Sequence, residues 1–517
     1  MSLPLLARFA AFVEDRPATT VLGLVTTLSV VRVILLVFYQ SGLGPDEAQY
    51  WFWGQTLDWG YYSKPPMIAW VIAIPTRIFG DHEWAVRLLS PVFIGGAGFL
   101  LFSAARRLYG DRVGVWAAGL WLSLPVVMFG ATIMSTDIPL LLFWSLGLYA
   151  LIGLAEAPAY ARGRWAALLG GAIGLGLLSK YAMVYFVLGW GLSLCISPYA
   201  RRTLSGGALA IVTAVAAIVF APNLLWNAKN GFQTLSHTAD NANWGAELLN
   251  PEELGQFLGD QFGVIGPFLF LALIFGCVTL GRRLRQAEGE ASKDLLLLSF
   301  IVPPLLIISV QALISRAHAN WAMTAYPAAM ILLPVWLIRL RARWVLWSSI
   351  ALHASAGVVF TAGLLSFSFA DQLGLSNAVK RLRGWTEQTE QLRAASKGLD
   401  GLIVDEREIA AHLVWEMRDA PFPLFVFDMN GHKDNTYEHV FPFTVDREKR
   451  YLIATQNLRF LCRYDVFANL IPKGESFVDL NAIRHDRPER LIYLYEASDY
   501  QAKGEETCPS IRETNAS

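Results

Sequence analysis

Residues 44–66 read GPDEAQYWFWGQTLDWGYYSKPP, and they follow directly on a long apolar segment at residues 19–41. That segment has the length of a membrane-spanning helix, which needs about 20 mainly apolar residues. The stretch behind it begins with an acidic pair, Asp46 and Glu47, continues through tryptophans and tyrosines, and ends on Lys64 before two prolines. A polar and aromatic loop at a membrane surface favours a binding or catalytic role.

The whole chain has the composition of a polytopic membrane protein. Of its 517 residues, 54% are hydrophobic and 16% are charged, and the mean hydropathy is +0.41, which is far above that of soluble domains. We predict eleven spanning helices, at residues 19–41, 84–105, 112–130, 137–155, 164–179, 181–197, 205–222, 261–281, 294–314, 320–338 and 344–369.

Lys and Arg are unevenly shared between two alternating sets of loops. One set carries arginine pairs such as Arg106-Arg107 and Arg201-Arg202, whereas the other set has few cations. Because positively charged loops stay in the cytoplasm, we predict a cytoplasmic N-terminus and an external acidic pair. No small-residue cleavage pattern follows the first span, so we expect it to remain as an anchor.

An odd number of spans places residues 370–517 outside as well. Their composition is of the soluble type, and short apolar runs such as GLIVD and PLFVFD flank the helix-like EREIAAHLVWEMR. We therefore predict a transmembrane domain at residues 1–369 and a small extracytoplasmic α/β domain at residues 370–517. Cys462 and Cys508 lie in this second domain, where they either form a disulfide or remain two thiols.

Further polar residues collect at the predicted outer ends of the helices. Ionisable residues are costly there, which makes each of them a functional candidate. They are Asp137 in MSTDIP, Lys180 in LLSKYA, His237, and Arg316, His318 and Asn320 in SRAHANW. Such cations can hold a phosphate, while a carboxylate can act as a base. Aromatic candidates for stacking on a sugar ring are Tyr50, Trp53, Tyr61, Tyr62 and Tyr181.

Each candidate also has an ordinary structural interpretation. Pro-Asp-Glu is a good helix opening, whose acids complement the helix dipole, and Ser-Thr-Asp-Ile-Pro around Asp137 is another. Lys64, His237 and His318 can be interface residues, and tryptophans and tyrosines line membrane surfaces in general. The helix opening explains the acidity of the first outer loop but not the aromatic content that follows.

Charge and motifs exclude several classes of function. The chain has 42 Lys and Arg against 42 Asp and Glu, which argues against a nucleic-acid partner. It contains no P-loop, GxGxxG, paired CxxC or HExxH pattern. No compact cluster of ligands is visible, so we assign no metal-binding residues; a divalent metal stays open but unsupported, and we predict no other cofactor.

Taken in order, the motifs resemble a known family. These are the DE pair in the first outer loop, the KPP element at residues 64–66, STD at the start of the fourth span, LLSKY in a helical hairpin, and the exported C-terminal domain. Together they are similar to the GT-C membrane glycosyltransferases of the protein O-mannosyltransferase and aminoarabinose transferase superfamily. The bacterial branch that they resemble is related to the lipopolysaccharide galacturonosyltransferases, over roughly residues 20–340.

The resemblance implies transfer of a sugar, with inversion, from a polyprenyl-phosphate carrier to an envelope acceptor such as lipid A or the lipopolysaccharide core. It implies Asp46 as the general base or acceptor-orienting acid, with Glu47 beside it. Asp137 corresponds to a second outer acid that orients the acceptor or holds a lysine. Lys64 and Lys180 correspond to lysines that we assign to the donor phosphate. Some members of the superfamily use a divalent metal.

Other functions fit the sequence less well. A secreted protein is an alternative acceptor for the same type of donor. A transporter or flippase of lipid-linked sugars is an alternative of a different class, but transporters place polar residues near the bilayer midplane in repeated halves. Here no internal repeat is visible and the polar residues lie at the outer helix ends. A scaffold protein explains neither the acidic pair nor the clustered cations.

Overall fold

The computed structural model of the chain divides into two compact units. One unit comprises residues 1–37 and 57–359, and the other comprises residues 38–56 and 360–517. The acidic pair is therefore grouped with the C-terminal residues, whereas the domain boundary at 369/370 stays a prediction. The residues that the structure describes are 15–240, 249–278, 289–428, 433–444, 446, 448–456, 458, 464, 466–480 and 490–501.

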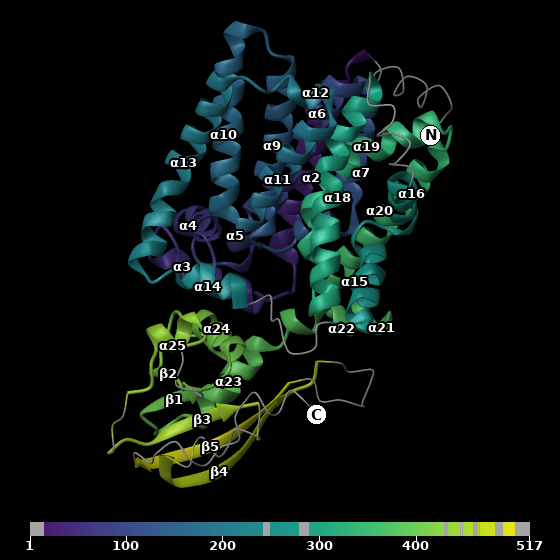
Figure 1. Cartoon of the computed structure of the whole chain (residues 1–517). Coiled ribbons are helices and arrows are strands. Elements are labelled where there is room, and N and C mark those ends of the chain that lie inside the picture. Colours follow the sequence, from purple (N-terminus) through teal and green to yellow (C-terminus); the bar gives the residue numbers. More distant parts are fainter. Residues whose placement is uncertain are drawn as a thin grey trace. The chain divides into compact units, whose positions relative to one another are not determined.

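The described residues of the first unit form helices and their connections (Figure 1). Among the described residues of the chain, seven helices are long and apolar enough to cross a membrane, and an eighth span results if a bent pair is counted as one. The seven are α2 (Pro17–Phe38), α5 with α6 (Glu83–Arg87 and Leu89–Tyr109), α9 (Asp137–Glu156), α13 (Gly206–Lys229), α18 (Glu290–Ile314), η3 with α19 (Ala319–Ala325 and Tyr326–Arg339) and α20 (Arg343–Leu365).

Shorter helices complete this unit, and they explain why the predicted number of eleven spans is not confirmed. The span predicted at residues 112–130 is broken before Pro125, and the one predicted at 261–281 crosses a bend of 119°. Gly266 lies at that bend with φ 87°, a conformation that favours glycine. The shorter helices are α4 (Met67–Phe79), α7 (Asp111–Ser123), α8 (Pro125–Gly130), η1 (Ala159–Ala161), α10 (Arg162–Ser179), η2 (Tyr181–Met183), α11 (Val184–Ile196), α12 (Pro198–Arg201), α14 (Gln233–Asp240), α15 (Pro251–Val264) and α16 (Pro267–Val278).

Close packing of α9, α10 and α13 fixes the part of this unit that carries the polar candidates (Figure 1). Gly170 and Gly174 of α10 face α13 at a helical spacing of four. A Cβ atom on Gly170 would lie 2.6 Å from the carbonyl oxygen of Val212, and one on Gly174 would lie 2.7 Å from the Cβ atom of Val219. Small residues at this spacing allow close helix approach in membranes.

The second unit is a small α/β structure, as the sequence predicts for its C-terminal part. Its sheet has the strand order β2-β1-β3-β5-β4, in which β1 pairs in parallel with β2 and β3, while β5 is antiparallel to β3 and β4. The strands are β1 (Gly401–Val404), β2 (Leu424–Val426), β3 (Tyr451–Thr455), β4 (Phe467–Val478) and β5 (Arg490–Tyr500). Ile403, Tyr451 and Phe467 belong to its buried core.

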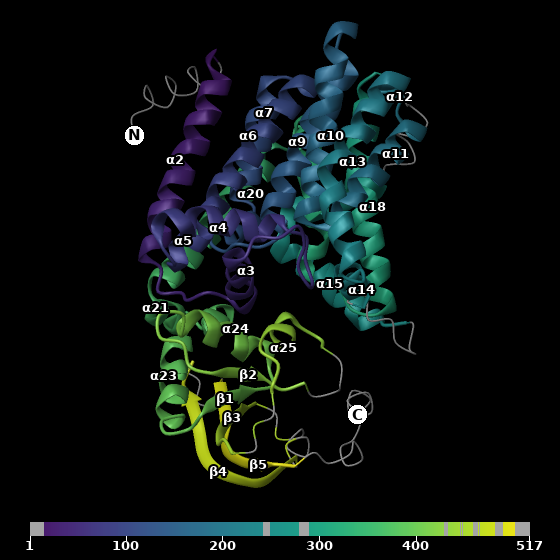
Figure 2. The same cartoon turned by 90° about the vertical axis from the view of Figure 1, so that its left-hand side faces the viewer.

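Helices of the second unit join the acidic segment to this sheet. They are α3 (Pro45–Gln55), α21 (Phe367–Gln372), α22 (Ser376–Val379), η4 (Lys380–Leu382), α23 (Trp385–Ala395), α24 (Arg407–Glu416) and α25 (Thr436–Val440). Helix α23 packs against β4 and α24, and α24 in turn packs against α3 (Figure 2). The backbone leading into α3 is fixed by two bonds, from the Gln40 amide to the Leu364 carbonyl (3.0 Å) and from the Gly42 amide to the Leu382 carbonyl (2.8 Å).

Cys462 and Cys508 lie outside the described residues, so their predicted alternatives stay open. The described residues include two cysteines, Cys195 in α11 and Cys277 in α16.

Candidate active site

Three polar candidates that are distant in the sequence meet in the first unit. Asp137 at the start of α9 accepts a hydrogen bond from Lys180 Nζ at 2.7 Å on one oxygen and from Asn320 Nδ2 at 2.9 Å on the other. The Asp137 side chain is 7% exposed and that of Lys180 is 24% exposed. A buried carboxylate paired on both oxygens holds the lysine in place, while an ammonium group has three donors and can bind a further anion.

The residue after Lys180 is anchored by asparagines of α13. The Tyr181 hydroxyl donates to Asn223 Oδ1 and accepts from Asn227 Nδ2, both at 3.0 Å. Asn223 and Asn227 are 0% and 1% exposed, so their bonds are shielded from water. Asn223 Nδ2 also donates to the Trp59 carbonyl at 2.6 Å, which connects the lysine hairpin to the loop at residues 57–66.

That loop is held in one conformation by its own bonds and by neighbouring helices. Trp226 Nε1 donates to Asp58 Oδ2 at 2.7 Å, and the Thr234 hydroxyl donates to the Tyr61 carbonyl at 2.6 Å. Gly60 leaves room for Trp226, since a Cβ atom there would lie 2.4 Å from the indole ring. The PNLLWN motif that contains Asn223 and Trp226 therefore positions the loop.

Aromatic and lysine candidates of the same loop differ in exposure. Tyr61 is 8% exposed, its hydroxyl accepts from the Asp58 amide at 3.1 Å, and burial raises its pKa to about 12. Tyr62 is half-buried and makes an edge contact with His237 at 5.5 Å between ring centroids. Lys64 is half-buried, and its carbonyl accepts from the Tyr61 amide at 3.1 Å.

The SRAHANW segment contributes one residue to the Asp137 cluster. Asn320 is the second residue of η3 and bonds Asp137, whereas Arg316 and His318 are exposed. The His318 ring makes an edge contact with Trp321 at 5.2 Å. Exposure keeps the Arg316 guanidinium accessible to an anion.

The acidic pair of the second unit separates into two roles. Glu47 is 4% exposed and accepts from the Gly44 amide at 2.9 Å, which satisfies the backbone N–H of the N-cap residue at the start of α3. Asp46 is exposed instead, with 61% of its side chain accessible, and Arg407 Nη1 lies 2.9 Å from its Oδ1 atom. The role of a helix opening therefore explains Glu47. Asp46 is the acid of the pair that stays accessible to a substrate.

Tyr50 and Trp53 are each 4% exposed and pack against one another at 5.4 Å between ring centroids. Trp53 Nε1 donates to the Thr436 hydroxyl of α25 at 3.2 Å. Trp51 makes an edge contact with Trp415 of α24 at 4.8 Å. These contacts give the aromatics of α3 a packing role within the second unit, and substrate binding by Tyr50 and Trp53 stays a prediction.

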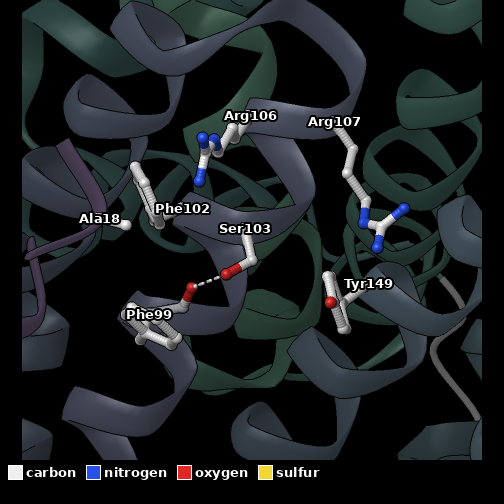
Figure 3. Close-up of a pocket in the computed structure, with 7 residues that line it drawn as sticks. All are labelled: Ala18, Phe99, Phe102, Ser103, Arg106, Arg107 and Tyr149. Atoms are coloured by element: carbon white, nitrogen blue, oxygen red, sulfur yellow. Dashed lines mark hydrogen bonds between the residues drawn. The ribbon is translucent and has the colours of Figure 1, made fainter. Parts of the chain in front are cut away.

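Two further polar sites lie at the opposite end of the membrane helices. Arg107 pairs with Glu156 at 3.6 Å, at the far end of α9 from Asp137. Twenty helical residues extend about 30 Å. A cavity of about 370 Å³ opens beside Arg107, lined also by Arg106, Ser103 and Tyr149 (Figure 3). Its two guanidinium groups are already paired with acids, since Arg106 Nε also contacts Asp111.

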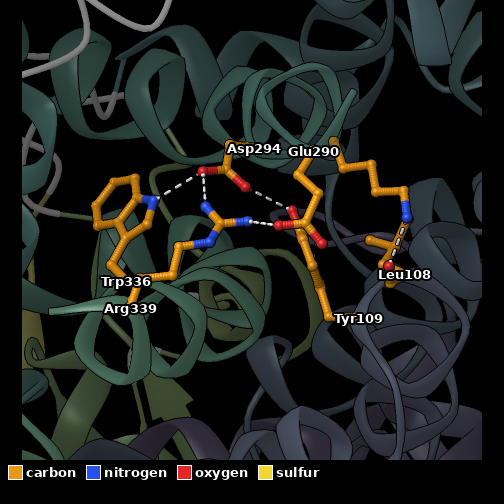
Figure 4. Close-up of polar contacts among 7 residues, drawn as sticks. Leu108, Tyr109, Glu290, Asp294, Trp336 and Arg339 are labelled. Atoms are coloured by element: carbon orange, nitrogen blue, oxygen red, sulfur yellow. Dashed lines mark hydrogen bonds and ion pairs between the residues drawn. The ribbon is translucent and has the colours of Figure 1, made fainter. Parts of the chain in front are cut away.

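The second of these sites is a buried ion cluster that ties α6, α18 and α19 together (Figure 4). Asp294 is fully buried and accepts from the Tyr109 hydroxyl at 2.8 Å, Trp336 Nε1 at 3.1 Å and Arg339 Nη1 at 2.7 Å. Arg339 also pairs with the exposed Glu290 at 2.7 Å. Each of these groups is bonded to Asp294 or to Arg339, which marks a structural cluster.

Arg407 and Gln49 are functional candidates that sequence reasoning missed. Arg407 follows the run GLIVDE at the end of β1, where loop residues of parallel sheets often bind ligands. That position was the one available signal, but the partner of Arg407 is 361 residues away and has no sequence signature.

Within the described residues, no group of three or more His, Cys, Asp and Glu side chains is arranged to hold a metal ion.

Comparison with known proteins gives one long match and several shorter ones. Residues 63–226 match the family described as dolichyl-phosphate-mannose-protein mannosyltransferase. The chain is 35% identical over 437 residues to lipid A galacturonosyltransferase RgtD of Rhizobium johnstonii, covering 83% of this chain and 89% of that protein. It is 31% identical over 169 residues to undecaprenyl phosphate-alpha-4-amino-4-deoxy-L-arabinose arabinosyl transferase 1 of Pseudomonas fluorescens, covering 30% of each.

Solved structures of one protein share the fold. The crystal structure of ArnT from Cupriavidus metallidurans in the apo state matches with a TM-score of 0.64 and 17% identity, over 94% of this chain and 100% of that one. The same protein bound to undecaprenyl phosphate matches with a TM-score of 0.62 and 17% identity, over 93% and 99% of the two chains.

Proposed function

This chain belongs to the GT-C membrane glycosyltransferases, in the branch of the bacterial lipid A and lipopolysaccharide galacturonosyltransferases, and on that premise we propose that it transfers a sugar from polyprenyl phosphate to lipid A. The observation that carries the proposal is its 35% identity to a lipid A galacturonosyltransferase over 89% of that protein's length. A uronic acid is accordingly the first sugar to test. Lipopolysaccharide core is the second acceptor to test.

We propose that the reaction takes place at the outer face of the inner membrane. The paired arginines at the ends of α6 and α12 are the residues that the positive-inside rule assigns to the cytoplasm. Asp137 begins α9, whose other end lies beside Arg107, so Asp137 and Lys180 fall at the outer end. The same rule gives a cytoplasmic N-terminus. The odd number of spans predicted from the sequence then puts residues 370–517 in the periplasm.

On the donor side, cations stabilise the phosphate that departs. The bond between the anomeric carbon and the phosphate oxygen breaks, and negative charge builds up on a lipid phosphate that is already a good leaving group. Lys180, fixed by Asp137, is the best-positioned cation, and Lys64 and Arg316 are the other candidates. Preorganised cations of this kind lower the barrier because they do not reorient during the reaction.

On the acceptor side, Asp46 is the proposed base. A sugar hydroxyl must lose its proton as its oxygen attacks the anomeric carbon from the face opposite the phosphate, which inverts the configuration there. A positioned carboxylate accelerates such a step by about 10²- to 10⁴-fold. If the acceptor is itself a phosphate group, no base is needed and Asp46 orients the acceptor.

The proposed function is tested with the purified full-length chain in detergent. Lipid A is incubated with radiolabelled polyprenyl phosphates that carry a uronic acid, an aminopentose or a hexose, and the products are separated by thin-layer chromatography. The expected result is label in lipid A from one donor. Label that stays on every donor and instead crosses the membrane of proteoliposomes would identify a transporter, and label in an added periplasmic protein would identify a protein acceptor.

A further inference from the structure

We propose that Arg407 of the C-terminal sheet-and-helix unit is a positioning residue that orients the carboxylate of Asp46, an inference that rests on the proposed function. Arg407 Nη1 lies 2.9 Å from Asp46 Oδ1 and 2.8 Å from Gln49 Oε1. Gln49 is 3% exposed and lies one helical turn after Asp46 on α3. One nitrogen thus bonds two side chains on the same side of the helix.

The ion pair of Arg407 with Asp46 contributes too little to folding stability to explain its presence by stability alone. Their side chains are 40% and 61% exposed, and ion pairs this accessible contribute about 0.2–1 kcal/mol. Arg407 is also the first residue of α24, where a positive charge opposes the helix dipole. A guanidinium group that lies at an unfavourable helix position and is bonded to an accessible acid is better explained by a role in orientation.

The surroundings of Arg407 hold it in place. Helix α24 packs against α3 through the edge contact of Trp415 with Trp51. Just before the helix, Asp405 at the end of β1 accepts from the Thr455 hydroxyl of β3 at 2.6 Å. The guanidinium group therefore projects from a framework of two strands and a helix, which positions a side chain more accurately than a loop alone.

This arrangement leaves one carboxylate oxygen for chemistry. Within the described part of the chain, Asp46 Oδ1 takes the Arg407 bond and no hydrogen bond reaches Oδ2. In the proposed step the acceptor oxygen bonds to the anomeric carbon, its proton passes to Oδ2, and the polyprenyl phosphate leaves with the electron pair of the broken bond. Arg407 supplies no proton; it fixes the direction of the Oδ2 lone pairs.

The test compares Arg407→Ala and Arg407→Lys with a matched control, Arg450→Ala, in full-length protein. Arg450 is an exposed arginine of the same unit that pairs with Glu496 at 3.2 Å, so its removal also breaks an ion pair. Misplacement of a catalytic group by about 1 Å costs on the order of 100-fold in rate. We expect kcat to fall by about that factor in Arg407→Ala, with an unchanged KM for the donor, and to stay unchanged in the control.

Chemical rescue separates orientation from a merely structural effect. Millimolar guanidinium should restore part of the activity of Arg407→Ala but none of the activity of Asp46→Asn, which lacks the carboxylate. If Arg407→Ala does not fold, Arg407→Lys decides, because it keeps the charge but not the reach and fork of the guanidinium: a lowered kcat in a folded protein supports the positioning role. Wild-type kcat in a folded Arg407 variant would overturn it.

The positioning role of Arg407 and the proposed sugar-transfer function can be rejected by different results. Loss of activity in Asp46→Asn together with normal activity in Arg407→Ala would reject the role of Arg407 and leave the proposed function intact. Normal activity in both variants would reject Asp46 as the base. No sugar transfer by wild-type protein from any donor would reject the proposed function itself.

Discussion

At the scale of single residues, the ion pair of Lys180 with Asp137 is the contact that most directly suggests donor binding. The carboxylate is almost inaccessible and bonded on both oxygens, so the lysine is held and not free to swing away. A fixed ammonium group at a helix hairpin is a suitable partner for a phosphate. We therefore propose that Asp137 holds the lysine, which is one of the two roles predicted for it.

Lys180→Ala should weaken use of the donor more than use of the acceptor. A charge-assisted hydrogen bond contributes about 1.5–3 kcal/mol, so the KM for the donor should rise roughly 10- to 100-fold. Steady-state kinetics with each substrate varied in turn gives the measurement. Lys229→Ala, which removes an exposed lysine at the end of α13, is the control. Equal rises in the KM for the donor and the KM for the acceptor would contradict the assignment of Lys180 to the donor phosphate.

Asp405 should make the stability of the second unit depend on pH. Burial, with a smaller contribution from Glu406, raises the pKa of Asp405 from 3.8 to about 6. The protonated acid therefore favours the folded state, and this stabilisation is complete below about pH 4 and lost as the pH rises through about 6. Asp405→Asn, which is neutral at every pH, should be more stable than wild type by about 2–3 kcal/mol above pH 7.

Thermal unfolding at several pH values measures that difference. The midpoint of Asp405→Asn should exceed that of wild type at about pH 8, and the gap should close as the pH falls to about 4. Asp419→Asn is the control, because the Asp419 side chain is 90% exposed. A gap of the same size at every pH would contradict burial of the ionised Asp405.

At the scale of elements, the buried cluster around Asp294 should stabilise the junction of α6, α18 and α19. Asp294→Ala leaves Arg339, Tyr109 and Trp336 without their shared acceptor, and removing one partner of a buried ion pair costs about 3–5 kcal/mol. Asp294→Asn keeps an acceptor oxygen and should cost less. The measurement is the thermal unfolding midpoint of purified protein in detergent.

Glu290→Ala is the matched control for this cluster. Glu290 contacts the same arginine, but its side chain is 67% exposed, so its loss should change stability by about 0–1 kcal/mol. Equal midpoints for Asp294→Ala and Glu290→Ala would show that burial does not strengthen the cluster.

At the scale of the whole molecule, hydropathy predicts the membrane class and composition predicts a soluble C-terminal part. Boundaries of long apolar helices such as α9 and α18 follow from the sequence to within a few residues. The break before Pro125 and the bend at Gly266 do not, because a 20-residue hydropathy window averages over local kinks. The grouping of residues 38–56 with the C-terminal unit also lacked a signal, since it depends on long-range packing of α3 against α24.

Residues of the candidate site could be predicted where a charged side chain lies in an apolar segment, because burying a charge there costs free energy. Lys180 and Asp137 stand out because charges in apolar hairpins need partners, and the structure pairs them. Arg407 did not stand out, because an arginine in a soluble α/β segment is common and its partner is remote in the sequence. Aromatics of α3 were ambiguous for a further reason, because stacking on a sugar and packing on a neighbouring helix require the same residue types.

The measurement that tests the central claim most directly is the initial rate of sugar transfer from polyprenyl phosphate to lipid A by wild type, Asp46→Asn and Asp419→Asn. Each variant removes one exposed carboxylate of the second unit. Wild type and Asp419→Asn should transfer at equal rates, and Asp46→Asn should be slower by about 10²- to 10⁴-fold. A wild-type rate in Asp46→Asn would contradict the assignment of Asp46 as the catalytic base of the first outer loop.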